Sequence, residues 1–201
     1  MALQRERLFM TNFYAVDIET NRIVDPEPVQ IAVVRFENGI EVAKWTKYFH
    51  AWHRSTKDAL RTHGLSRRKL KEKKANPFCK LQAKAMIEFL DIKNEWPITS
   101  FNVEFDRDKV LKPAFKLVGL EDKLAADDRW RCAQELCKRT ENWKLWSLDD
   151  ALEHFGFDRR KDDEFHDALH DARLAAKVYM KAIKLKPLKD SGLGFYKPTK
   201  E

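Results

Sequence analysis

Val16-Asp17-Ile18-Glu19-Thr20 closes a stretch, starting at residue 9, that is rich in β-forming residues. A strand there places Asp17 and Glu19 on the same face, because successive side chains point to opposite sides. Two neighbouring carboxylates are costly at the end of an apolar strand unless a cation lies between them. Hard divalent cations such as Mg²⁺ or Mn²⁺ prefer these oxygen ligands. The alternative is an exposed strand end whose carboxylates face water, which is the commoner meaning of an isolated Asp-x-Glu.

The strands that follow predict an antiparallel meander near the N-terminus. Residues 29–36 form a second apolar run, and residues 40–49 form a third. Asn38-Gly39 between them is a strong hairpin signal. A short buried strand is expected at 97–101. Helices are predicted at 55–61, 78–90, 106–117, 130–137, 148–155 and 165–183. Strands followed by mixed helices and strands predict an α/β fold in which helices cover a central mixed sheet.

Composition and charge limit the classes of protein to which the chain can belong. With 201 residues it fits one compact domain, and its 39 Lys and Arg against 32 Asp and Glu give a net charge of +7. A basic balance favours polyanionic partners, although a solvated basic surface is the plainer alternative. No apolar run approaches the roughly 20 residues that span a bilayer, and no secretory segment is recognisable. Three cysteines without CxxC spacing indicate reduced, core-filling thiols in a cytoplasmic compartment rather than a zinc site.

A second polar segment follows the predicted strand at 97–101. Asn102 and Asp106 flank Phe105, where the strand passes through a turn into a helix. A carboxylate is favoured near a helix N-terminus, and there it can also face a ligand site at the strand's end. Taken alone, Asp106 is more often a helix cap.

The third segment begins the last predicted helix. His166 stands at its entrance and Asp171 lies further along, while Ala168 and Ala172 allow the helix to pack closely on the sheet. The two polar residues can address one cleft if His166 projects from the helix entrance. The spacing of His166 and His170 also suits zinc, but no further ligands with zinc spacing accompany the pair.

Together, the three segments resemble the motifs of one family, the DEDDh exonucleases, which include the proofreading subunit of bacterial DNA polymerase III, RNase T and oligoribonuclease. Asp17-Ile18-Glu19-Thr20 is similar to the first motif, Asn102-x-x-Phe105-Asp106 to the second, and His166-x-Ala168-x-x-Asp171 to the third. The resemblance spans about residues 9–183 and implies a ribonuclease H-like fold with a five-stranded sheet. We expect the exonuclease domain to cover residues 1–184, with a basic insert at about 66–77 and a basic tail at 185–201.

The resemblance also implies a mechanism. Asp17, Glu19, Asp106 and Asp171 would hold two Mg²⁺ ions about 4 Å apart, for which Mn²⁺ substitutes, and His166 would act as general base. The expected activity is 3′→5′ release of 5′-mononucleotides from single-stranded DNA, in a polymerase or repair complex. The alternatives are a 3′→5′ exoribonuclease or oligoribonuclease-like enzyme, and an inactive nucleic-acid-binding module. No motif separates DNA from RNA, because recognition of the 2′-hydroxyl depends on the shape of the pocket.

Several residues are candidates to contact the substrate. Thr20, Ile23 and Phe105, and more weakly Asn102, are expected beside the terminal nucleotide, with ordinary packing as the alternative. Many family members follow the first motif with Thr-Gly, whereas this chain has Asn21-Arg22, so the adjoining loop is expected to differ. The basic run of the insert is either a phosphate-contacting surface or a solvated face; it contains Arg67, Arg68, Lys69, Lys71, Lys73 and Lys74.

Overall fold

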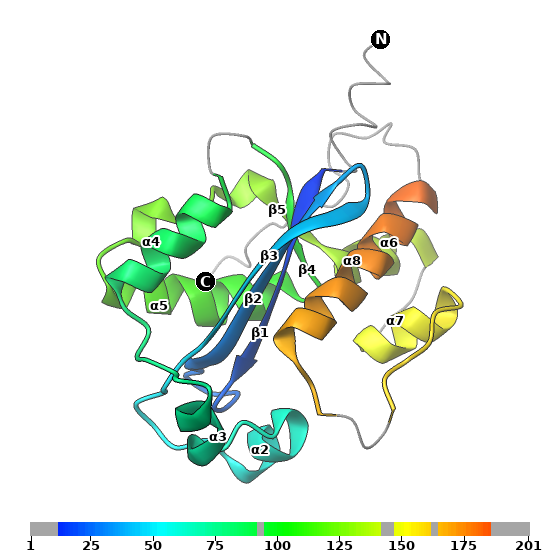
Figure 1. Cartoon of the computed structure of the whole chain (residues 1–201). Helices are drawn as coiled ribbons and strands as arrows, with labels where there is room; N and C mark the ends of the chain where they lie inside the picture. Colours follow the sequence, from blue (N-terminus) through cyan, green and yellow to red (C-terminus); the bar gives the residue numbers. More distant parts are fainter. Residues whose placement is uncertain (1–11, 92–94, 142–146, 162–164, 186–201) are drawn as a thin grey trace.

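A five-stranded mixed sheet divides the molecule, with helices on both of its faces (Figure 1). The computed structural model describes residues 12–91, 95–141, 147–161 and 165–185. The strands are β1 (Phe13–Thr20), β2 (Pro28–Glu37), β3 (Ile40–Tyr48), β4 (Ile98–Ser100) and β5 (Trp130–Cys132), in the spatial order β3-β2-β1-β4-β5. β1, β2 and β3 pair antiparallel, while β4 pairs parallel with β1 and with β5. The predicted fold class and the N-terminal meander are therefore confirmed.

The hairpin between β2 and β3 turns at Asn38-Gly39, where the sequence predicted it. Both residues have positive φ angles, 52° for Asn38 and 76° for Gly39. Two-residue hairpins favour turns with both φ angles positive because the twist of such turns matches that of the strands. Asn and Gly are the residues that adopt this conformation at least cost.

Two apolar cores lie on opposite faces of the sheet. On one face lie α6 (Ala133–Glu141), α7 (Leu148–His154) and α8 (Ala168–Leu185) (Figure 1). Their buried side chains form one core with Phe13 and Ala15. On the other, α4 (Lys80–Phe89) and α5 (Lys112–Leu117) cover Tyr14 and Val16. The alternation along β1 continues to Asp17 and Glu19, which therefore leave the strand on the α8 side.

The close approach of α8 to the sheet depends on small residues, as the sequence indicated. Ala168, Ala172, Ala175 and Ala176 are all fully buried. The helix starts at Ala168 rather than at the predicted residue 165, because Asp167 caps it. The Asp167 carboxylate accepts hydrogen bonds from the backbone N–H groups of Leu169 and His170, both at 3.1 Å.

Two other predicted helices are corrected. The segment predicted as a helix at 130–137 begins as strand β5 and becomes α6 only at Ala133. Pairing with β4 outweighs the local helical pattern, because Trp130 and Cys132 are buried in the same core as Ile98.

The helix predicted at 106–117 starts at Glu104 as η2 (Glu104–Leu111), which has a π-helical register, and continues as α5. Pro113 then falls in the first turn of α5, where its missing N–H is tolerated.

Two short helices, α2 (Lys57–His63) and α3 (Arg67–Glu72), lie where β1 ends (Figure 1). Thr56 caps α2, which begins two residues later than the helix predicted at 55–61. α3 covers residues 67–72 of the predicted basic insert, and its Leu70 packs against Val29 and Leu65.

Single turns η3 (Glu121–Lys123) and η4 (Asp127–Arg129) precede β5. Cys132 and Cys137 are buried as expected, whereas Cys79 is exposed because it precedes α4 at the surface. None of the described helices is long and apolar enough to cross a bilayer. The predicted tail, from residue 186 onward, lies outside the described residues.

Candidate active site

Four carboxylates from three elements share one buried region. Glu19 is 7% exposed, Asp106 5% and Asp171 3%, while Asp17 is half-buried. Burial raises the pKa of Asp17 well above its usual range, and the charges of Asp106, Glu19 and Asp171 raise it further. Burial and the charge of Asp171 raise the pKa of Glu19 to about 8, and burial raises that of Asp106 to about 7. The structure therefore brings together the four carboxylates that the sequence singled out.

This donor set fits a hard divalent cation. Ligand atoms of Glu19, His166 and Asp171 all lie within 4.8 Å of one another. Oxygen-rich sites of high negative charge suit Mg²⁺ or Mn²⁺, and a cation would offset both the burial and the mutual repulsion of these carboxylates.

His166 stands at the entrance of α8, beside Asp171. Its Nδ1 lies 3.4 Å from Asp171 Oδ2, and its backbone N–H donates to the carbonyl oxygen of Thr62 at 2.9 Å. Burial and then the nearby charge of Arg160 lower the pKa of His166 to about 4. The imidazole is therefore neutral at pH 7 and able to accept a proton. His170, by contrast, is exposed.

Arg160 reaches the cluster and was not anticipated from the sequence. It comes from the segment between α7 and α8, its side chain is 8% exposed, and its Nη1 donates to Asp171 Oδ2 at 2.6 Å. Its Nε and Nη2 bind the two carboxylate oxygens of Asp149 at 3.1 and 2.8 Å. No periodic pattern surrounds Arg160, so only the folded chain reveals that it faces the acidic cluster.

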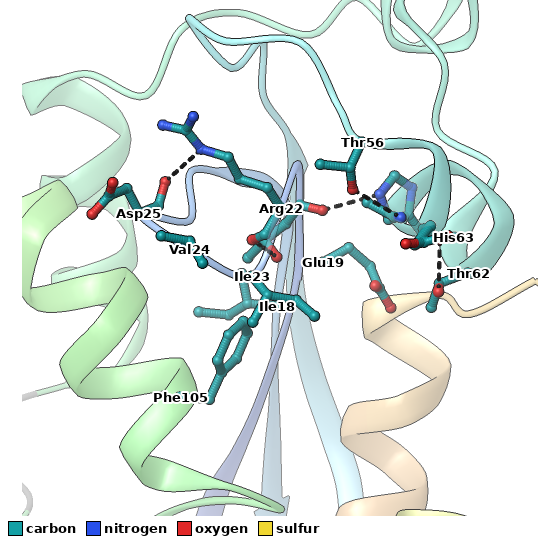
Figure 2. A pocket seen from close by; sticks show the side chains of 13 residues that line it. Ile18, Glu19, Arg22, Ile23, Val24, Asp25, Thr56, Thr62, His63 and Phe105 are labelled. Atoms are coloured by element: carbon teal, nitrogen blue, oxygen red, sulfur yellow. Dashed lines mark hydrogen bonds between the residues drawn. The ribbon is translucent and has the colours of Figure 1, made fainter.

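A pocket of about 510 Å³ opens beside Glu19 (Figure 2). Its wall is formed by the end of β1, the loop after it, α2 and the start of η2. Three of the predicted substrate-contacting residues, Thr20, Ile23 and Phe105, line it, together with Glu19. Asn102 is not part of this wall: it is exposed, and its side-chain oxygen accepts from the N–H of Phe105 at 3.4 Å. Asn102 therefore shapes the turn that carries Phe105.

In the loop after β1, where this chain has Asn21-Arg22 in place of Thr-Gly, Asn21 anchors the backbone. Asn21 is fully buried, and its side chain exchanges two hydrogen bonds with Glu27. Asn21 Nδ2 donates to Glu27 Oε2 at 2.8 Å, and Glu27 N donates to Asn21 Oδ1 at 2.9 Å. Glu27 also accepts from the backbone N–H groups of Trp52 and His53, at 3.2 and 2.9 Å. The pocket rim is thus tied to the segment leading into α2.

His63, at the end of α2, lines the pocket and was also not anticipated from the sequence. Its buried ring lies between the carbonyl oxygen of Thr20, 3.1 Å from Nε2, and the N–H of Leu65, which donates to Nδ1 at 2.9 Å. These partners require a neutral ring that donates from Nε2, and burial lowers the pKa of His63. The only sequence feature that could have drawn attention to His63 is its position directly before Gly64, which ends the helix.

The basic run divides between exposed and engaged side chains. Arg67 and Arg68 are exposed on α3, and Arg68 lies 3.9 Å from Glu72. The ammonium of Lys69 lies 4.8 Å from the centre of the Phe165 ring, and that of Lys73 lies 4.3 Å from the Tyr48 ring. The run therefore does not act as one uniform surface.

The sheet order and the acidic cluster beside β1 define a ribonuclease H-like nuclease. The chain belongs to the RNase_T exonuclease family, whose model matches residues 15–179. This confirms the predicted family and the predicted class of enzyme, a 3′–5′ exonuclease. The narrower resemblance to the proofreading subunit of DNA polymerase III stays a prediction.

Solved structures with the same fold share little sequence with this chain. The nuclease domain of 3′hExo, a DEDDh family member bound to rAMP, superposes with a TM-score of 0.67 at 14% identity, covering 95% of this chain and 98% of that one. Exonuclease X in complex with 5′ overhanging duplex DNA gives 0.62 at 15% identity, covering 90% and 97%. A 3′-exonuclease that recognises the histone mRNA stem-loop gives 0.67 at 14%, covering 87% and 82%. No curated protein sequence matches the chain.

Proposed function

We propose that this protein removes nucleotides one at a time from the 3′ end of single-stranded DNA and releases 5′-mononucleotides. The observation that carries the proposal is the position of the four clustered carboxylates and His166 beside a pocket that suits a nucleotide. The pocket's volume, about 510 Å³, falls within the usual range for small-ligand sites. Asp17, Glu19, Asp106 and Asp171 would hold two Mg²⁺ ions, for which Mn²⁺ substitutes.

When bound, the divalent cations would supply positive charge against the scissile phosphate and lower the pKa of the attacking water. Glu19 and Asp171 lie with His166 in one compact group, so the proton acceptor would lie next to the metal ligands. Neutral His166 takes the proton of the attacking water. Its lowered pKa keeps the imidazole unprotonated across the neutral range, as a proton acceptor must be.

The pocket would hold the terminal nucleoside. Ile18, Ile23 and Phe105 offer apolar surface to the base and sugar, and Thr20 adds a hydroxyl. Glu19 lies in the same wall, so a 3′-phosphate would place negative charge against its carboxylate. We therefore expect a free 3′-hydroxyl to be required.

The choice of polymer has one serious alternative, a 3′→5′ exoribonuclease. The 3′hExo nuclease domain was solved with rAMP and another neighbour recognises an mRNA stem-loop, whereas Exonuclease X was solved with DNA. Family resemblance favours DNA, since more of its members act on DNA. A polymerase or repair complex is then the proposed setting. Duplex ends should react more slowly, because the terminal base must first leave its partner at a cost of a few kcal/mol.

The test is a time course with matched single-stranded DNA, duplex DNA and RNA, each end-labelled, with and without Mg²⁺. We expect stepwise shortening from the 3′ end, fastest on single-stranded DNA, and a stall on a 3′-phosphate. A faster reaction on RNA would transfer the proposal to the exoribonuclease alternative. Cuts within circular single-stranded DNA, or mononucleotides released first from the 5′ end, would overturn it.

A further inference from the structure

The paired side chains of Asp149 and Arg160 hold the Asp171 carboxylate from outside the acidic cluster. We infer that this pair is a positioning device that orients Asp171 for binding a divalent cation. The inference rests on the proposed function, because it assigns Asp171 to the metal site. It concerns Asp149 and Arg160, which belong to none of the three motifs.

The guanidinium is fixed at three of its atoms. Arg160 Nε and Nη2 donate to the two oxygens of Asp149 at 3.1 and 2.8 Å, and Nη1 donates to Asp171 Oδ2 at 2.6 Å. The backbone N–H of Arg160 also donates to Asp149, at 3.4 Å. A planar fork held on one edge by a carboxylate presents its remaining N–H groups in a set direction.

The Asp171 carboxylate therefore has a defined orientation before any cation binds. Its Oδ2 lies between Arg160 Nη1 at 2.6 Å and His166 Nδ1 at 3.4 Å. Asp171 itself is on the first turn of α8, where its backbone N–H donates to the carbonyl of Asp167 at 2.9 Å. Backbone and side chain are thus both constrained, and hydrogen-bonded partners of ligating carboxylates commonly contribute to metal affinity.

Arg160 could instead act as a built-in replacement for a cation. The charges argue against this, because Asp149 neutralises Arg160 through a bidentate pair. Because Arg160 Nε and Nη2 bind both Asp149 oxygens, the pair as a whole adds no net positive charge to the four carboxylates. A divalent cation therefore still has a strong electrostatic reason to bind.

The same contacts could be purely structural, since they join the start of α7 to the start of α8. A structural role predicts lost folding stability with unchanged metal affinity in the fraction that remains folded. A positioning role predicts weaker metal binding by a folded protein. Metal affinity measured without nucleic acid separates the two.

The experiment is calorimetric titration of the full chain with Mn²⁺, with no nucleic acid present. Arg160→Gln should weaken Mn²⁺ binding by about 10- to 100-fold, the usual effect of losing such a partner. Arg160→Lys keeps the positive charge but not the planar guanidinium, so its Mn²⁺ affinity should fall between those of wild type and Arg160→Gln. Arg159→Gln is the matched control. The Arg159 side chain is 52% exposed and its Nη1 lies 3.3 Å from Glu153 Oε2, so this substitution should leave Mn²⁺ affinity unchanged.

Asp149→Asn gives an independent arm. It frees the guanidinium without touching Asp171, so it should weaken Mn²⁺ binding in the same direction. The double variant with Arg160→Gln should lose little more than Arg160→Gln alone, because the two residues act as a unit. Circular dichroism before each titration establishes that the variants are folded. If Arg160→Gln does not fold, the Mn²⁺ affinity of Arg160→Lys still tests the inference.

Several results would overturn the inference. Unchanged or tighter Mn²⁺ binding by Arg160→Gln or Arg160→Lys would mean that the arginine only competes with the cation or only ties the helices. An equal loss in Arg159→Gln would point to the general charge of the segment. If wild-type protein binds Mn²⁺ and Asp17→Asn does not, the metal site stands whatever Arg160 does. If wild-type protein binds no Mn²⁺, both the site and this inference fail.

Discussion

The backbone N–H of His166 donates a hydrogen bond to the carbonyl oxygen of Thr62 at 2.9 Å, which ties the proposed general base to α2. A second contact joins the same two segments, because the ring of the preceding residue, Phe165, packs directly on Gly64. A Cβ atom built at Gly64 would lie 2.9 Å from that ring, closer than such atoms approach in real proteins. Gly64 thus permits both the left-handed end of α2, at a φ of 64°, and the approach of the segment carrying His166.

Gly64→Ala should therefore impair catalysis more than it impairs folding. The new methyl group would push away Phe165 and shift His166, and a displacement of about 1 Å can lower a rate by about 100-fold. Gly119→Ala is the matched control, because Gly119 has a similar φ of 68° and no atom within 4 Å of its added Cβ. Both variants should lose about 1 kcal/mol or more in unfolding free energy from the strained φ.

Steady-state rates and denaturant unfolding of these two glycine variants check this. Equal rates for the two, at equal stability, would show that the contact between Gly64 and Phe165 does not position His166.

The exposed part of α3 should contribute to binding of the strand, while Lys69 should act mainly through Phe165. Neutralising Arg67 and Arg68 should reduce the salt dependence of single-strand binding, by about 1.4 in the log–log slope if both contact phosphate. Titrations of a labelled oligonucleotide in Ca²⁺ at several salt concentrations measure this slope. Lys80 and Lys84, exposed on α4, supply the control pair. An unchanged slope in the Arg67 and Arg68 variant would return α3 to the solvated-face alternative.

The acidic cluster should make the metal-free protein less stable as pH rises. Folding raises the pKa of Glu19 from 4.5 to about 8, so the folded state binds more protons than the unfolded state between these values. The favourable contribution is complete below pH 4.5 and is lost as pH rises towards 8. Asp17 and Asp106, whose pKa values are also raised, act in the same direction.

Denaturant unfolding in EDTA between pH 5 and pH 8 should therefore show this loss, and Mg²⁺ should restore stability most strongly at pH 8. Glu19→Gln should flatten the pH dependence, whereas Glu121→Gln, at an exposed position, should not. A metal-free stability that rises over this range, with no response to Mg²⁺, would contradict the electrostatic account.

Much of the site could be predicted because its residues occupy positions with regular geometry. The period of two in β1 was enough to put Asp17 and Glu19 on one face, and the helix entrance was enough to place His166 beside Asp171. The hairpin at Asn38-Gly39 was equally local. In each case the deciding interaction lies within a few residues along the chain.

Contacts that depend on distant segments could not be predicted. Strand β5 has a helical pattern, and only pairing with β4 makes it a strand. Arg160 acquires its role when α7 and α8 come together, and His63 acquires its role when α2 docks on Thr20. No periodicity in the sequence indicates these contacts between distant segments.

We propose that the carboxylate cluster and His166 catalyse metal-dependent release of nucleotides from the 3′ end. The measurement that decides this is the single-turnover rate of 5′-mononucleotide release from a 3′-labelled single strand in Mg²⁺, for wild type, Asp17→Ala, His166→Ala and His170→Ala. We predict no detectable turnover for Asp17→Ala with the fold intact. His166→Ala should be slower by about two to four orders of magnitude, and His170→Ala should stay within a few-fold of wild type. Turnover by Asp17→Ala close to the wild-type rate, or equal losses at the two histidines, would contradict the account.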